Sequence, residues 1–126
     1  MKKLLIIEDD LKFASFVTNL LKSNDDFEVH HAEKGMQGIK LYEEVKPDCV
    51  LLDGKLPDMD GAVVFNKIKE IDNTAKIIIL SATISANSGM HEKNPFLNLD
   101  AAGFIPKPFK PDFLNDVLDS VLYENE

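Results

Sequence analysis

Apolar runs of strand length alternate along the chain with stretches whose apolar residues recur at helical spacing. The runs at 4–7, 49–52 and 77–80 are continuously apolar, which is typical of parallel strands that helices cover on both faces. The runs at 27–32 and 103–106 are more polar or contain a proline, so we expect them at the edges of the sheet. The alternation predicts an α/β fold with a doubly wound parallel sheet.

The helical stretches follow the strands in turn. We expect helices after Asp10, over 34–46, after the turn at Asp60-Gly61, and from Pro111 onward. Residues expected to face the core are Phe13, Phe16, Val17, Leu20 and Leu21 in the first helix, and Phe113, Leu114, Val117, Leu118, Val121 and Leu122 in the last. The periodicity fails over 82–102, where Asn94-Pro95 is the only helix-start signal. Five strands would then alternate with five helices.

Polar and charged residues stand where four of these strands end. Right-handed crossovers bring the carboxyl ends of parallel strands to one edge of the sheet, where α/β proteins bind their ligands. That edge would carry Glu8-Asp9-Asp10, Asp53, Ser81 and Lys107. Helix capping suits Asp10, and a turn cap would account for Asp53 taken alone. Three consecutive acids exceed what one cap requires, so we interpret this edge as functional.

Several carboxylates brought close together cannot all ionise cheaply without a counter-charge, and Lys107 supplies only one. The cluster therefore predicts a divalent cation, and Mg²⁺ suits carboxylates and a backbone oxygen while leaving positions for phosphate oxygens. The set predicts a phosphoryl-transfer site. Asp53 would be the nucleophile, Lys107 would neutralise developing charge, and Ser81 would donate a hydrogen bond to a phosphoryl oxygen.

Composition narrows the function classes further. The chain has 126 residues and a net charge of −8, so we expect one domain over 1–126 that does not bind nucleic acid directly. No apolar run is long enough to span a bilayer and no signal peptide follows Met1, which predicts a cytoplasmic protein. Cys49 reads as a buried hydrophobe, and His30 and His31 as structural residues of an edge strand.

Four motifs resemble the receiver domain of two-component response regulators along essentially the whole chain. They are IIEDD after the first strand, LLDGKLPDMDG around Asp53, ILSAT at the end of the fourth strand, and GFIPKPF before the last helix. The resemblance implies a (βα)5 flavodoxin-like fold with strand order 2-1-3-4-5.

The resemblance also implies a role for each site residue. Asp53 would be phosphorylated from a histidine kinase or a histidine phosphotransfer protein, and the Lys107-Pro108 bond would be cis. Glu8 and Asp9 would form the acid pair that helps to bind Mg²⁺. The direct ligands of the ion would be Asp9, Asp53 and the backbone carbonyl of Lys55. Ser81 and Phe104 would be the switch residues. The output would be a downstream protein target or an output domain not included in the sequence.

The sequence departs from the usual receiver pattern in three places. Lys55 brings a cation to a position that, with Thr83, influences the lifetime of the phosphoryl group. The segment 82–102 is longer than usual and poorly helical. Lys110 stands where Ser or Thr commonly caps the last helix. The lack of arginine and the acidic last helix also predict a monomer.

Three other functions remain open on the sequence alone. A phosphatase of the haloacid dehalogenase type would need a second acid two residues after the nucleophile, where Lys55 stands. A flavodoxin-like electron carrier would need hydroxyls and glycines in the acidic first loop. A receiver-like domain that binds partners without phosphorylation would not need the full set of site residues that this chain carries.

Overall fold

The computed structural model describes residues 2–23, 25–81 and 99–123. Its five strands form one parallel sheet in the order β2-β1-β3-β4-β5. The strands are β1 (Lys2–Ile7), β2 (Phe27–Ala32), β3 (Cys49–Asp53), β4 (Ile77–Ser81) and β5 (Gly103–Pro106). The helices are α1 (Leu11–Lys22), α2 (Gly35–Val45), α3 (Gly61–Ile71) and α4 (Pro111–Tyr123). The predicted sheet, its strand order and its edge strands are confirmed.

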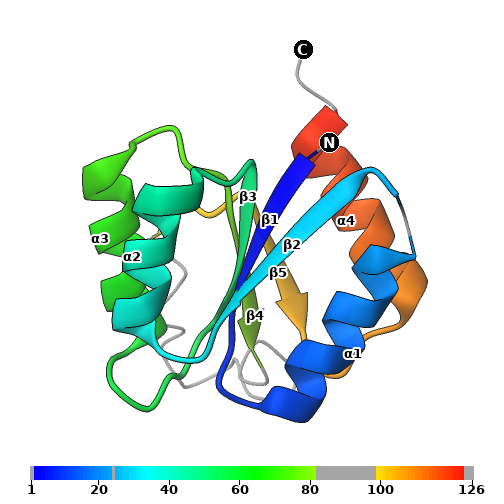
Figure 1. Cartoon of the computed structure of the whole chain (residues 1–126), viewed down its shortest axis with the longest axis horizontal. Helices are drawn as coiled ribbons and strands as arrows, with labels where there is room; N and C mark the ends of the chain where they lie inside the picture. Colours follow the sequence, from blue (N-terminus) through cyan, green and yellow to red (C-terminus); the bar gives the residue numbers. More distant parts are fainter. Residues whose placement is uncertain (1, 24, 82–98, 124–126) are drawn as a thin grey trace, which may run out of the picture.

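Two helical layers cover the sheet, with α2 and α3 on one face and α1 and α4 on the other (Figure 1). Alternate residues of the three central strands feed the two cores, so Leu5 and Leu52 pack under α2 and α3, whereas Ile6 and Leu51 pack under α1 and α4. Both faces of β3 are therefore buried. This burial explains why its apolar run does not alternate with polar residues.

The boundaries differ from the prediction in a few places. Strand β1 begins two residues before the apolar run because Lys2 and Lys3 pair with β2. The last helix begins at Pro111, as predicted, and α2 occupies 35–45 within the predicted range. The helix start at Asn94 lies outside the described residues.

Two aromatic residues do not face the core as the helical pattern predicted. Phe16 is 43% exposed and Phe113 is 42% exposed. In α1 the buried positions are Ala14, Val17 and Leu21 instead. Phe16 lies at the margin of this stripe, where its ring meets the side chain of Phe13 at 6.3 Å between centroids. Spacing alone gives the centre of a helix face but not how far the sheet covers its margins.

Two aspartates satisfy the free N–H groups at helix starts. The Asp10 carboxylate accepts hydrogen bonds from the backbone N–H groups of Lys12 and Phe13, which confirms the predicted cap of α1. The Asp58 carboxylate reaches α2 from the loop before α3 and accepts from Gly35 N and Met36 N at 2.8 and 3.0 Å. These two bonds fasten the loop after β3 to the neighbouring helix.

We expect the Asp58 bonds to make stability depend on pH. The two backbone donors hold the pKa of Asp58 below its ordinary value of 3.8, so its contribution is fully present above that value. The contribution is lost as the pH falls through the lower pKa of the folded state. Urea unfolding of the protein and of Asp58→Ala should therefore show a stability gap at neutral pH that narrows in acid. A gap that widened in acid would contradict this.

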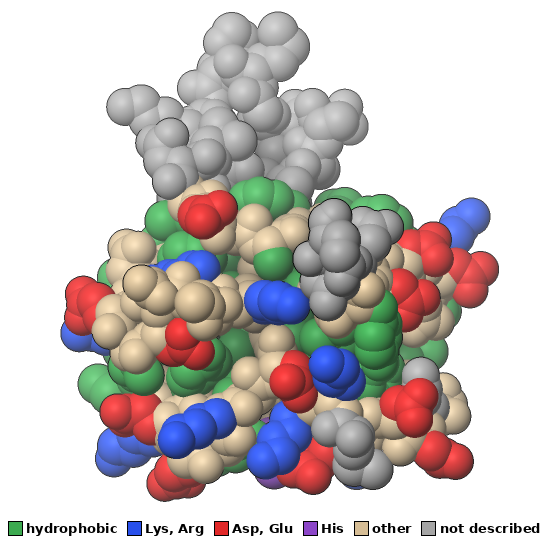
Figure 2. Space-filling view, turned by 90° about the horizontal axis from the view of Figure 1, so that it is seen from above, with side chains coloured by type: hydrophobic (Ala, Val, Ile, Leu, Met, Phe, Trp, Pro, Cys, Tyr) green, Lys and Arg blue, Asp and Glu red, His purple; other side chains and the backbone are tan. Residues whose placement is uncertain are grey.

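The face at the amino ends of the strands has a different character. Figure 2 looks onto this face and shows acidic and lysine side chains interspersed over it. Here the Tyr42 hydroxyl donates to the Asp72 carboxylate at 3.0 Å, in a shallow groove that Pro47 also lines. Charges of both signs are mixed on this side, in contrast to the acidic cluster at the carboxyl ends.

None of the described helices combines the length and the hydropathy needed to cross a bilayer.

Candidate functional site

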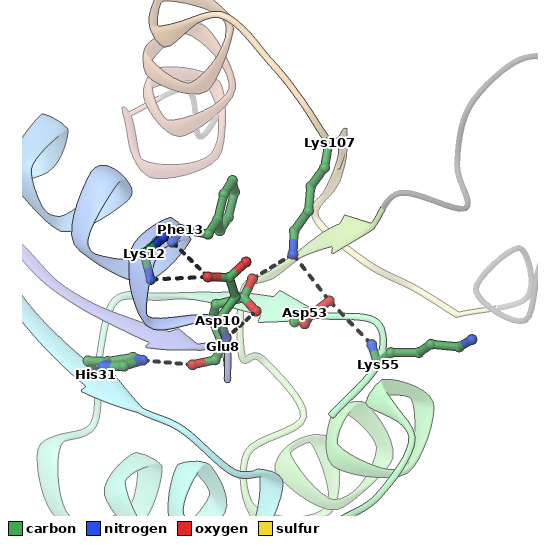
Figure 3. A network of polar contacts seen from close by, with 8 residues as sticks. All are labelled: Glu8, Asp10, Lys12, Phe13, His31, Asp53, Lys55 and Lys107. Atoms are coloured by element: carbon green, nitrogen blue, oxygen red, sulfur yellow. Dashed lines mark hydrogen bonds and ion pairs between the residues drawn. The ribbon is translucent and has the colours of Figure 1, made fainter. Parts of the chain in front are cut away.

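The carboxyl ends of β1, β3 and β5 bring three carboxylates and one ammonium together. Glu8 and Asp9 directly follow β1, Asp53 ends β3, and Lys107 directly follows β5. Figure 3 shows Lys107 reaching from its loop toward both Glu8 and Asp53. The sequence predicted this convergence from the strand ends alone.

Glu8 is the most deeply buried acid of the site, at 1% exposure. Its Oε1 accepts a hydrogen bond from Lys107 Nζ at 2.6 Å, and its Oε2 accepts one from Asp10 N at 3.1 Å. Burial raises the pKa of Glu8, and the Lys107 ammonium opposes that shift. Both carboxylate oxygens thus have protein partners, so Glu8 is fixed in orientation by the protein itself.

Asp53 is also buried, at 8% exposure, although it is charged. Its Oδ1 accepts a hydrogen bond from Lys55 N at 3.3 Å and lies 3.5 Å from Lys107 Nζ. The side chain of Lys55 points away from the carboxylates in Figure 3. Lys55 therefore contacts the Asp53 side chain through its backbone N–H, while its ammonium is directed elsewhere.

Glu8, Asp9 and Asp53 form an acidic pocket typical of a magnesium site. Each can offer one carboxylate oxygen, and these three oxygens lie within 4.8 Å of one another. Three negative charges face the single positive charge of Lys107 there, which leaves an excess that a hard cation would neutralise. The donors fit Mg²⁺ in type, since carboxylate oxygens are its usual protein ligands.

The loop after Asp53 is held closed by its own backbone. Gly54 N donates to Leu80 O at 2.9 Å, and Gly61 N donates to Gly54 O at 3.0 Å. Between them, Lys55 and Asp60 form an isolated antiparallel bridge. Gly61 permits this approach, because a Cβ there would lie 2.7 Å from the backbone oxygen of Asp53. The chain therefore leaves Asp53 in a tight turn tied to β4.

The other described residues that were predicted to belong to the site lie on or next to β4 and β5. Ser81 ends β4 and is in register with Pro106, and the role of its hydroxyl stays a prediction. Phe104 is half-buried on β5 and packs against the core under α2 and α3. The Lys107-Pro108 bond is cis, as predicted. Thr83 lies outside the described residues.

Three features of the site were not foreseen from the sequence. His31, interpreted as structural, contacts the Glu8 carbonyl oxygen at 2.8 Å through Nε2. Asp58 fastens the loop after Asp53 to α2. The ring of Phe13 lies against the Lys107 ammonium, at 4.4 Å from Nζ to the ring centroid. Each contact joins segments distant in sequence, and no local pattern signals such a pairing.

Known proteins match this chain along most of its length. Residues 4–119 match the family described as response regulator receiver domain. The chain belongs to this family. A relative is "Chemotaxis protein CheY" of Listeria monocytogenes, 37% identical over 119 residues that cover 94% of this chain and 97% of the relative. The protein of the same name from Bacillus subtilis is 32% identical over 95% of this chain and 97% of its own.

Solved receiver domains have the same fold. The signal receiver domain of a putative Luxo repressor protein from Vibrio parahaemolyticus superposes with a TM-score of 0.84 at 28% identity, covering 98% of this chain and 91% of that chain. The complex described as CheX-CheY-BeF3-Mg+2 from Borrelia burgdorferi contains a chain with a TM-score of 0.79 at 25% identity, covering 95% and 88%.

Membership in this family settles the general function. The chain is a CheY-like receiver domain, a phosphoacceptor of two-component signalling rather than an enzyme that turns over a substrate. The phosphatase and the flavin-dependent electron carrier are therefore set aside.

Proposed function

We propose that Asp53 is the residue of this receiver domain that accepts the phosphoryl group. The observation that carries the proposal is the position of its carboxylate, at the end of the central strand and 3.5 Å from Lys107 Nζ, inside a cluster with Glu8 and Asp9. A charged, buried carboxylate beside an ammonium is suited to attack phosphorus and to have its product stabilised.

The pocket would hold Mg²⁺ through Asp9, Asp53 and the backbone carbonyl of Lys55. Glu8 is better suited to orient the pocket than to bind directly, because both of its oxygens already accept hydrogen bonds from the protein. When bound, the ion supplies charge neutralisation for the carboxylates and for the phosphoryl oxygens.

The residues of this chain act on a phosphoryl group that arrives on a histidine of the donor protein. An oxygen of Asp53 attacks phosphorus, the O–P bond forms, and the P–N bond breaks with its electron pair remaining on the histidine nitrogen. Lys107 then pairs with a phosphoryl oxygen, and the Ser81 hydroxyl donates to another. The Ser81 and Phe104 pair would report this change to the surface, while Lys55 and Thr83 would tune the lifetime of the product.

The phosphoryl donor would be a histidine kinase or a histidine phosphotransfer protein. The receiver would then act on a downstream protein target, or on an output domain outside these 126 residues. The Borrelia chain described together with CheX shows that a similar receiver assembles with a second protein. We propose that this chain likewise acts through contact with a second protein, without direct contact to nucleic acid or membrane.

Metal dependence tests the proposed site. We expect acetyl phosphate to add one phosphoryl group to the protein in the presence of Mg²⁺, and excess EDTA to reduce the yield by roughly a hundredfold, because the excess negative charge of the pocket then opposes the phosphate. Intact-protein mass spectrometry measures the adduct. An adduct that forms equally in EDTA would refute the metal site, and no adduct in either condition would favour a receiver that binds partners without phosphorylation.

We also propose that the receiver remains monomeric when it is activated. The chain has no arginine for paired contacts with carboxylates, and α4 exposes Asp112, Asp116 and Asp119 along one helix. Two copies of that helix would meet as like charges. Light scattering with Mg²⁺ and BeF₃⁻ should give a monomer mass, and a shift to twice that mass would show that the repulsion argument is wrong.

A further inference from the structure

The Lys107 ammonium lies between two carboxylates and an aromatic ring. Nζ is 2.6 Å from Glu8 Oε1, 3.5 Å from Asp53 Oδ1 and 4.4 Å from the centroid of the Phe13 ring. Figure 3 shows the Phe13 ring beside the lysine, on the α1 side of the carboxylates. An ammonium has three N–H donors, and the two carboxylates lie in the directions of only two of these N–H bonds.

Phe13 is itself held in place by a ring from the loop that carries the lysine. Phe109, two residues after Lys107, meets Phe13 edge to face at 5.7 Å between centroids and 89° between planes. Phe16 lies 6.3 Å from Phe13 at a tilt of 45°. Edge-to-face and tilted pairs at these separations are attractive. The loop after β5 therefore docks on α1 through these rings while Lys107 extends over the nearest one.

Ordinary packing at the margin of α1 is the alternative explanation for these rings. Two observations go against packing alone. The Lys107–Phe13 distance is shorter than the 5.7 Å found both for Lys2 over Tyr123 and for Lys69 over Phe65. The Lys107 side chain is only 20% exposed, and a cation is drawn more strongly to a ring face when water is largely removed.

We propose that Phe13 is a positioning residue for Lys107, whose ring face keeps the ammonium directed at Asp53. The effect on phosphoryl transfer rests on the proposed function of Asp53 and Lys107. The ring offers no strong hydrogen-bond acceptor, so it restricts the lysine without competing with a phosphoryl oxygen for it. An aliphatic side chain of similar size would fill the space but would lack the negative ring face.

Three variants separate positioning from packing. Phe13→Leu removes the ring and Phe13→Tyr retains it. Phe16→Leu removes another ring of the trio formed by Phe13, Phe16 and Phe109, one over whose face no ammonium lies among the described residues. Phe13→Met replaces the leucine variant if that variant does not fold, since methionine adapts to irregular spaces. Urea unfolding establishes that each variant is folded before it is compared.

The first measurement is the proton NMR shift of the Lys107 ε-methylene group without metal or phosphate. The ring current of Phe13 should move this signal upfield, and the shift should be lost in Phe13→Leu but kept in Phe13→Tyr and Phe16→Leu. The second is the rate of phosphorylation by acetyl phosphate at saturating Mg²⁺. It should fall roughly two- to fivefold in Phe13→Leu, the range that corresponds to one cation–π contact, and recover in Phe13→Tyr.

The two measurements keep the proposals distinguishable. An unchanged Lys107 signal in folded Phe13→Leu, or a rate equal to that of the unaltered protein, would overturn the positioning role. An equal loss in Phe16→Leu would show that packing of the trio, and not the contact with the ammonium, is responsible. Failure of the unaltered protein to accept phosphate would overturn the proposed function instead, and the NMR arm would still report whether the ring holds the lysine.

Discussion

Replacing Asp53 by asparagine should reduce phosphorylation by roughly a thousandfold or more, because the amide keeps the shape of the side chain but removes the nucleophilic oxygen. Asp53 lies at the end of a fully buried strand, so the nearly equal size of asparagine keeps the strand and the turn in place. Acetyl phosphate, Mg²⁺ and intact-protein mass spectrometry measure the yield.

A matched control comes from the other end of the same strand. Asp48 stands just before β3, and its carboxylate accepts a hydrogen bond from Lys3 N. The side-chain carbonyl oxygen of an asparagine at this position can accept the same hydrogen bond. Asp48→Asn removes one carboxylate from the chain and should be phosphorylated as the unaltered protein is. If Asp53→Asn still forms the adduct at the original rate, another residue is the acceptor and the assignment is wrong.

Lys107→Ala should uncouple metal binding from activation. Removal of a positive charge from a pocket of three carboxylates should tighten Mg²⁺ binding by roughly tenfold. The interaction energy of two unit charges a few ångströms apart near a protein surface is large enough for a change of that size. The BeF₃⁻ adduct should bind more weakly, because its fluorine atoms lose the ammonium that would pair with a phosphoryl oxygen. Calorimetric titration measures the first effect, and ¹⁹F NMR the second.

Lys110→Ala is the appropriate control for charge alone. Lys110 belongs to the same loop and is exposed, and no contact joins its side chain to the acidic pocket within the part of the chain that the structure describes. A much smaller change in Mg²⁺ affinity is expected there, since exposed charges are screened by solvent and salt. Loss of Mg²⁺ binding in Lys107→Ala would instead mean that the lysine helps to build the metal site, contrary to its proposed role.

Without metal, the same Lys107 variant should be less stable. Glu8 is almost completely buried and would lose its ion-pair partner, and an unpaired buried charge is costly. We expect a loss of about 1–3 kcal/mol in the free energy of unfolding, recovered in part when Mg²⁺ is added. Urea unfolding with and without Mg²⁺ gives both values.

The parts of the structure that the sequence revealed are those set by local pattern. Continuous apolar runs identified the buried strands, and the parallel arrangement then placed Glu8, Asp53 and Lys107 at one edge without knowledge of any contact. Asp10 was recognisable as a cap because its partners are its own neighbours. For these residues, position along the chain carries the necessary information.

The rest depended on pairings between distant segments. The rings of Phe13 and Phe16 are equivalent core positions in the sequence pattern of one helix face, yet Phe13 contacts Lys107 and Phe16 is 43% exposed. The distinction comes from the loop after β5, which brings the Lys107 ammonium over the ring of Phe13, while Phe109 of the same loop meets both rings. No local pattern revealed the role of Asp58, because its partners lie 22 and 23 residues away in α2.

The closed loop after Asp53 has a consequence for the thermodynamics of ligand binding. Its backbone is tied to β4 by Gly54, closed on itself at Gly61, and fastened to α2 through Asp58. The conformational entropy of this segment is therefore lost when the protein folds, and little remains to be lost when an ion or a phosphoryl group arrives. Binding on the β3 side of the pocket is preorganised, so its free energy reflects charge and coordination more than the ordering of the chain.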